Sequence, residues 1–181
     1  AGLIDVSNGK IKDIRYEVRY FPIWQDKKEN LSKIVQEVSS GLAHSDTINA
    51  IGVTMTAELS DIFKTKREGV KYVLRNIEKI NILNPKVVDY YGNLISIDES
   101  VEDYLKVSSA NWAATSKVLT KIFKNCILID VGSSTTDIIP MINHRVIVSG
   151  RTDIERLSSG ELVYTGILRN SISSIVHKVP V

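Results

Sequence analysis

The chain has 181 residues, of which 43% are apolar and 24% charged, the ordinary composition of a globular domain that can bury a core. Its formal net charge of +2 gives no electrostatic reason to expect nucleic acid or an anionic membrane as a partner. The single cysteine, Cys126, excludes an internal disulfide framework or a thiolate metal cluster and favours a reducing, cytoplasmic location.

Apolar periodicity and turn residues divide the chain into alternating strands and helices. The predicted elements are, in order, a hairpin of 1–6 and 11–20 around Asn8-Gly9, a helix over 27–40 stopped by Gly41, a strand over 48–55, a helix over 70–80 ended by Pro85, a strand over 87–91, two helices at 101–105 and 110–123, a buried strand over 126–131, and a hairpin of 136–142 and 145–148 around Asn143-His144. This order predicts an α/β domain on a mixed sheet.

The two ends of the chain suggest a piece of a longer polypeptide. The sequence opens on Ala1 rather than Met and stops at Val181 directly after an apolar segment. No apolar run approaches the roughly 20 residues that a membrane helix needs, and no charged-then-apolar leader opens the sequence. We therefore expect a fragment of a protein that neither spans a membrane nor is exported.

The segment from Asp130 to Asp137 joins one apolar strand to the next and carries an acid at each end. Backbone N–H groups and small hydroxylated side chains in such a turn can surround phosphate oxygens. The residues predicted to bind phosphate are Gly132, Ser133, Ser134, Thr135 and Thr136. Asp130 and Asp137 are predicted to be catalytic residues whose ionised carboxylates bind Mg²⁺, directly or through water. Mg²⁺ prefers hard oxygen ligands and keeps several waters. The alternative is a polar β-turn in which aspartate and glycine only form the corner.

The spacing Asp130-x-Gly132-x-x-x-x-Asp137 resembles the second phosphate motif of the superfamily of actin, sugar kinases and Hsp70 ATPases. The longer stretches are similar to the hydantoinase/oxoprolinase family, and within it to the archaeal branch of tetrahydromethanopterin-linked C1-transfer pathway proteins. The matching stretches are 21–24, 53–59, 110–115, 129–140, 150–153 and 159–166. The resemblance implies an actin-like ATPase fold, which is ribonuclease H-like, with a mixed sheet and flanking helices. It assigns 1–125 to an N-terminal lobe and 126–181 to the start of a second lobe.

One feature of that superfamily is missing from the sequence. Its members usually begin with a glycine-rich first phosphate loop of the Asp-Ile-Gly-Gly type. The nearest match here is 5–10, whose Ser-Asn-Gly-Lys centre fits better the hairpin turn that normally comes next. We therefore expect the first strand with its loop, and elements beyond Val181, to lie outside these residues.

Six further residues are candidates for the site. Arg151 follows the glycine that ends the last hairpin, and its guanidinium suits phosphate, although Thr152 or Asp153 could instead cap a helix there. Glu58 follows the strand ending at Met55 and is a candidate catalytic base, although acids at helix starts are commonly solvated. The residues predicted to contact substrate, in or near the glycine-bounded segment 160–166, are Asp153, Glu161, Tyr164 and Thr165.

The resemblance implies an enzyme that binds ATP with Mg²⁺, or a diphosphate substrate. It favours the amine-coupling reaction expected of the methanofuran-biosynthesis synthase that joins an aminomethylfuran diphosphate to γ-glutamyltyramine. The alternatives are an ATP-dependent hydantoinase or oxoprolinase-like amidohydrolase, a small-molecule kinase, and a non-catalytic nucleotide-sensing module. The expected partner is a small phosphorylated molecule rather than nucleic acid or membrane, and the β-rich edge 15–21 is a candidate contact for a homo-oligomer.

Overall fold

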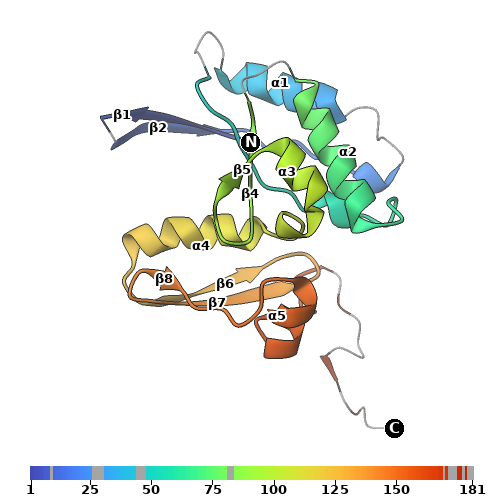
Figure 1. The fold of residues 1–181 in the computed structure, drawn as a ribbon, viewed down its shortest axis with the longest axis vertical. Helices are drawn as coiled ribbons and strands as arrows, with labels where there is room; N and C mark the ends of the chain where they lie inside the picture. The colour runs from blue at the N-terminus through green and yellow to red at the C-terminus, as the bar shows by residue number, and fades with distance from the viewer. Residues whose placement is uncertain are drawn as a thin grey trace. The chain divides into compact units, whose positions relative to one another are not determined.

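The computed structural model describes residues 1–8, 10–25, 31–43, 48–80, 84–168, 170, 175–176 and 178. The chain forms two compact units, each with its own helices and strands (Figure 1). Unit 1 consists of Ala1–Val87 and Leu94–Ser108, and unit 2 of Val88–Asn93 and Ser109–Val181. The α/β class predicted from the sequence is therefore confirmed. The lobe boundary expected after residue 125 stays a prediction.

Unit 1 carries the first part of the element order. Its strands are β1 (Gly2–Ser7), β2 (Lys10–Tyr16), β3 (Gly52–Val53), β4 (Lys86–Val88, whose last residue belongs to unit 2) and β5 (Leu94–Ile95). Its α-helices are α1 (Leu31–Ala43), α2 (Lys66–Glu78) and α3 (Ile97–Glu102), and its 3₁₀ turns are η1 (Ile23–Gln25), η3 (Ala57–Leu59) and η4 (Tyr104–Lys106).

The first predicted hairpin is present, and the first predicted helix extends further toward its C-terminal end than expected. β1 pairs antiparallel with β2, from Gly2 opposite Tyr16 to Ser7 opposite Lys10. The second strand stops at Tyr16, short of the predicted 20. Helix α1 continues through Gly41, so the prediction that this glycine ends it is wrong. The physical reason is that the next residues, Leu42 and Ala43, are buried and extend the apolar face of the helix. The predicted helix residues 27–30 lie outside the described residues.

The core of unit 1 forms where α2 packs near a short three-stranded sheet. β3 pairs parallel with β4, and the three-strand order is β3-β4-β5. Val70 and Leu74 of α2 and Val87 of β4 are each 0% exposed. The strand predicted over 48–55 is confined to Gly52–Val53. Thr65 caps α2, since its side chain accepts a hydrogen bond from the Glu68 N–H.

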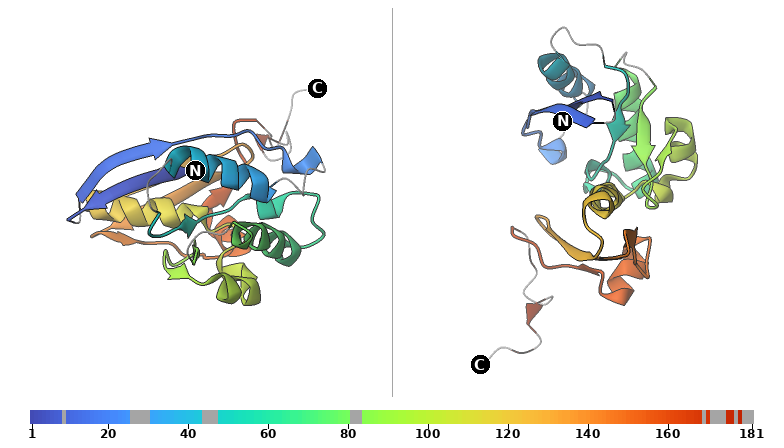
Figure 2. Two further views of the ribbon diagram at one scale, coloured as in Figure 1. Left: turned by 90° about the horizontal axis from the view of Figure 1, so that it is seen from above. Right: turned by 90° about the vertical axis from the view of Figure 1, so that its left-hand side faces the viewer.

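Unit 2 is built on one four-stranded antiparallel sheet. Its elements are α4 (Asn111–Ile122), β6 (Cys126–Val131), β7 (Thr136–Ile142), β8 (Arg145–Val146), α5 (Asp153–Ser159) and β9 (Leu162–Val163). The strand order is β6-β7-β8, with β9 pairing β7 near its start. Figures 1 and 2 show α4 lying along this sheet. Trp112 and Ala113 of α4 pack there against Ile139 of β7.

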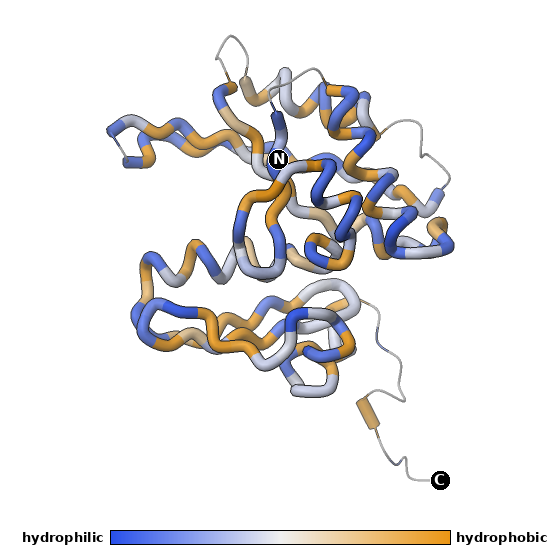
Figure 3. The backbone as a smooth tube through the Cα atoms, viewed as in Figure 1, coloured by the Kyte–Doolittle hydropathy of each residue, from blue (hydrophilic) through white to orange (hydrophobic). Residues whose placement is uncertain are grey.

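The bounds predicted for β6 and β7 are confirmed, but β6 is not buried on both faces. Its exposure alternates along the strand, with Ile127 65% and Ile129 62% exposed, while Leu128 packs toward Trp112. Figure 3 shows hydrophobic segments along these strands. The expectation of a covered strand fails because β6 lies at the sheet edge and α4 covers one face. None of the helices formed by the described residues is long and apolar enough to span a bilayer.

Candidate phosphate-binding site

The predicted phosphate segment forms a tight corner between β6 and β7. Asp130 and Asp137 lie directly opposite each other in the antiparallel pair, and Val131 faces Thr136. The corner closes where the Gly132 N–H donates to the Thr135 carbonyl at 2.8 Å. The antiparallel register therefore places the two acids at the base of the corner.

The backbone N–H groups and carbonyls of this corner are used unequally by the described residues. The N–H groups of Ser133, Ser134 and Thr135 have no acceptor among the described residues. The carbonyls are used instead, because the N–H groups of Ile167 and Leu168 donate to those of Gly132 and Ser133 at 3.0 and 2.9 Å. Free N–H groups in succession suit an anion.

A following segment packs against the corner and fixes it. Gly166 touches the backbone of Ser133 and Ser134, where a Cβ at position 166 would collide with both. Thr136 donates its hydroxyl to the carbonyl of Thr165. Thr136 and Thr165, predicted to contact phosphate and substrate, are thus bonded to each other and hold the corner. Tyr164 is 56% exposed beside them.

The carboxylate of Asp137 accepts a hydrogen bond from a buried arginine. Nη1 of Arg156 lies 2.7 Å from Oδ1 of Asp137, and the Arg156 side chain is 1% exposed. Desolvation raises the pKa of Asp137 above its ordinary value, and the guanidinium opposes that rise. Sequence reasoning missed Arg156. The amphipathic pattern of α5 predicts that its apolar residues face the core. Ile154 is nevertheless 77% exposed, and the arginine is the buried residue of that helix.

Glu161 and Arg151 have partners within unit 2. The Glu161 carboxylate accepts from the N–H groups of Ser149 and Gly150 at 2.5 and 3.0 Å. Burial pushes the pKa of Glu161 upward, but these backbone donors and nearby serine hydroxyls outweigh it and lower the pKa. The Arg151 guanidinium donates to the Tyr90 carbonyl at 3.3 Å and lies 4.8 Å from the centre of the Tyr91 ring.

The helix cap expected after Gly150 is present. Thr152 is the N-cap of α5, and its hydroxyl accepts from the Glu155 N–H in a capping box. Asp153 is the first helical residue, and its carboxylate accepts from the Ser109 hydroxyl at 3.1 Å. Of the two residues that the sequence allowed as cap, Thr152 has this role.

One candidate belongs to a different unit from the others. Asp130, the corner residues, Asp137, Arg151, Asp153, Glu161, Tyr164 and Thr165 all belong to unit 2, whereas Glu58 belongs to unit 1. Glu58 is 1% exposed and accepts a hydrogen bond from the Ser108 hydroxyl at 3.4 Å. It is therefore buried and not a solvated helix-start acid.

A family model matches the chain over the part that holds this corner. The model of the hydantoinase/oxoprolinase family matches residues 49–179. The chain belongs to this family. The resemblance predicted from the sequence is confirmed.

Two curated relatives of this hydantoinase/oxoprolinase chain carry the same name, (4-{4-[2-(gamma-L-glutamylamino)ethyl]phenoxymethyl}furan-2-yl)methanamine synthase. The protein from Methanocaldococcus jannaschii is 37% identical over 179 residues, which are 96% of this chain and 52% of the relative. The protein from Methanococcus vannielii is 48% identical over 62 residues, which are 34% of this chain and 28% of that relative. The chain thus spans about half the length of the first of these relatives.

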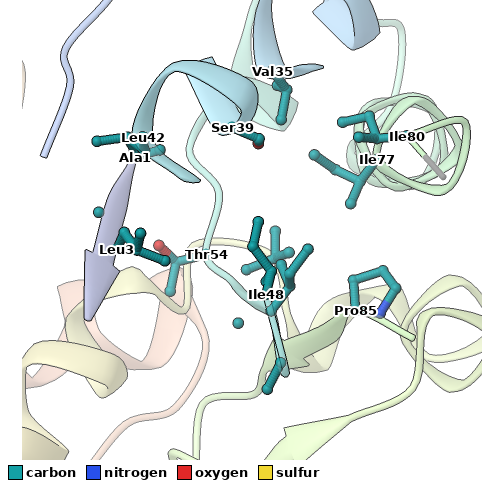
Figure 4. A pocket seen from close by; sticks show the side chains of 15 residues that line it. Ala1, Leu3, Val35, Ser39, Leu42, Ile48, Thr54, Ile77, Ile80 and Pro85 are labelled. Atoms are coloured by element: carbon teal, nitrogen blue, oxygen red, sulfur yellow. The ribbon is translucent and has the colours of Figure 1, made fainter. Parts of the chain in front are cut away.

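The hydantoinase/oxoprolinase chain also has an apolar pocket, which lies in unit 1 (Figure 4). Its volume is about 490 Å³, and β1, α1, α2 and the segment around β3 contribute its walls. Leu3, Val35, Ile48 and Ile77 are among the lining residues, and none of the lining residues is Asp, Glu, Lys, Arg or His. A pocket without charged side chains is less suited to a phosphate than the corner, so the corner is the candidate site.

The acids at the corner suit Mg²⁺ only if substrate phosphates and water supply its other ligands. The described residues contain no group of three or more His, Cys, Asp or Glu side chains that could enclose a metal ion. Mg²⁺ is commonly held by one or two carboxylates together with substrate phosphates and water. Asp130 fits that arrangement, because it is half-buried and its side chain has no partner among the described residues.

Proposed function

We propose that this chain supplies the diphosphate-binding corner of an enzyme of methanofuran biosynthesis, a synthase that acts on an aminomethylfuran diphosphate. The observation that carries the proposal is the run of three N–H groups, at Ser133, Ser134 and Thr135, that have no acceptor among the described residues and follow Asp130 in the same turn. The names of the two relatives support the reaction class. The location that we propose is the cytoplasm, in keeping with a single free cysteine.

The relatives' name suggests which bond such an enzyme makes. It contains a phenoxymethyl group, in which a phenol oxygen is bonded to a furan methylene carbon. We therefore place the attack at a phenol oxygen, in place of the amine coupling expected from the sequence. In this step the carbon–oxygen bond to the phenol forms and the bond from the same carbon to diphosphate breaks. The diphosphate leaves with the electron pair, and the phenol proton passes to solvent water.

The residues of the corner act on the leaving group. The N–H groups of Ser133, Ser134 and Thr135 donate to diphosphate oxygens as negative charge develops on them. Asp130 would hold Mg²⁺, which neutralises part of that charge when bound. Arg151 is the further anion contact that we propose, and an actin-like fold would supply the rest of the ligand's surroundings.

Calorimetric titration of the chain with pyrophosphate and Mg²⁺ tests the proposal. Asp130→Asn is expected to weaken pyrophosphate binding about tenfold or more, the loss that a charge-assisted contact of roughly 1.5–3 kcal/mol implies. Asp98→Asn is the matched control, because the Asp98 side chain is 87% exposed on α3 in the other unit. Equal affinity of the wild-type chain and Asp130→Asn would refute the site, and absence of binding to the wild-type chain would refute the function.

A second function is favoured by the family description itself. The description names hydantoinases and oxoprolinases, and the second function that we propose is accordingly an ATP-dependent amidohydrolase. ATP hydrolysis that rises on addition of a hydantoin or of 5-oxoproline would support that function. Binding of pyrophosphate without ATP turnover would favour the synthase.

A further inference from the structure

Arg156 is a buried cation that the proposed chemistry does not yet use. Its side chain is 1% exposed, and its guanidinium carbon lies 4.1 Å from the centre of the Trp112 ring. Nη1 donates to Asp137 and Nη2 donates to the Glu161 carbonyl at 3.1 Å, whereas Nε is buried with no hydrogen-bond partner among the described residues. A buried ion pair seldom adds stability over an apolar pair of the same volume, so the burial of this arginine calls for another reason.

The two acids at the base of the corner are unequal. Asp137 faces Asp130 across the strand pair, and its Oδ1 is 2.7 Å from the guanidinium. The Asp130 side chain, in contrast, has no hydrogen bond or ion pair among the described residues. Two ionised carboxylates side by side would repel a diphosphate, and a guanidinium bonded to one of them removes much of that repulsion.

Two elements hold the guanidinium at the corner. Trp112 of α4, 2% exposed, lies against its face, and the Glu161 carbonyl just before β9 accepts from its outer nitrogen. Gly150 makes room for this arrangement, because a Cβ at that position would collide with the Arg156 backbone. The position of Arg156 is thus set by the fold of unit 2 and does not depend on a ligand.

We propose that Arg156 is a positioning residue that fixes and neutralises Asp137, so that Asp130 is the acid that faces the metal and diphosphate. This inference rests on the proposed function. Arg156 acts through Asp137 and does not itself touch the ligand.

Pyrophosphate affinity in the presence of Mg²⁺, measured on the full chain well below its unfolding temperature, tests the assignment. Arg156→Met leaves the Asp137 charge uncompensated and is expected to weaken binding about tenfold. Adding Asp137→Asn to Arg156→Met removes that charge and is expected to recover most of the loss. Arg145→Met, at an exposed arginine of β8, is the control for loss of a positive charge in the same unit.

The outcomes separate this inference from the proposed function. If Arg156→Met binds as tightly as the wild-type chain, or if the double variant stays as weak as Arg156→Met, the positioning role is refuted while the function stands. If the wild-type chain binds no pyrophosphate, the proposed function is refuted and the inference with it. Should Arg156→Met fail to fold, the double variant still decides, because affinity as weak as that of Asp130→Asn would refute the role.

Discussion

Glu161 fastens the loop after β8 to the strand β9 through one carboxylate. It accepts from Ser149 and Gly150 and is 9% exposed. Glu161→Gln keeps the shape, but the amide has only one acceptor oxygen, so one of the two hydrogen bonds is lost together with the charge. We therefore expect the free energy of unfolding to fall by about 2 kcal/mol at neutral pH. Denaturant unfolding measures this difference, and Glu102→Gln on the exposed side of α3 is the matched control.

The pH dependence of this difference in the free energy of unfolding follows from the direction in which folding shifts the pKa of Glu161. Folding lowers the pKa of Glu161, so its contribution to stability is present above the ordinary pKa of a glutamate and is lost as pH falls through the lowered value. The stabilities of the wild-type chain and Glu161→Gln should therefore converge in acid. A difference that stays constant across that pH range would contradict the role of the charge.

At the scale of single residues, local sequence predicted the turn between the two acids and Thr165 beside it, but not the buried arginine that contacts Asp137. The spacing of Asp130, Gly132 and Asp137 sufficed because all three lie in one turn between adjacent strands. Arg156 could not be found in this way, because a charged residue in an amphipathic helix is expected to face solvent. Its partners, Asp137 and Trp112, come from other elements, and no local pattern encodes that meeting.

Helix α5 is the element that presents Arg156, and its start depends on one hydroxyl. Thr152 accepts from the Glu155 N–H, and the Glu155 carboxylate accepts in return from the Thr152 N–H at 3.0 Å. Thr152→Ala is expected to lower the free energy of unfolding by about 1 kcal/mol. Thermal unfolding monitored by circular dichroism checks this against Thr115→Ala, an exposed residue of α4. Equal stability of the two variants would mean that the cap contributes nothing.

At the scale of elements, type and order were more predictable than extent. The hairpin of β7 and β8 turns at Asn143 and His144, both at positive φ, and the sequence predicted it there. The strand β3 is only two residues long, although a nearly continuous apolar run over 48–55 predicted it. Apolar content signals burial, whereas a strand also needs a neighbour to pair with, and β3 pairs with β4 over two residues.

At the scale of the whole molecule, the two units have separate cores, and we expect a change in one core to destabilise mainly its own unit. Leu74 of unit 1 is 0% exposed among Val70, Val73 and Val87. Leu74→Ala is expected to lower stability by about 3 kcal/mol through the cavity that it leaves. Hydrogen exchange should show the loss of protection in unit 1, with the amides of β7 in unit 2 less affected. Val118→Ala, at a 61% exposed position, is the control. Equal loss of protection in both units would show that they unfold together.

The exposed apolar face of β6 affects the tendency of this chain to aggregate in solution. Ile127, Ile129 and Val131 point out of the sheet in a row, 65%, 62% and 46% exposed. An exposed apolar row of this kind favours association with other apolar surfaces, including the same row on a second copy of the chain at high protein concentration. We therefore expect the purified chain to aggregate at high concentration, and we expect dilution or a mild detergent to reduce that aggregation.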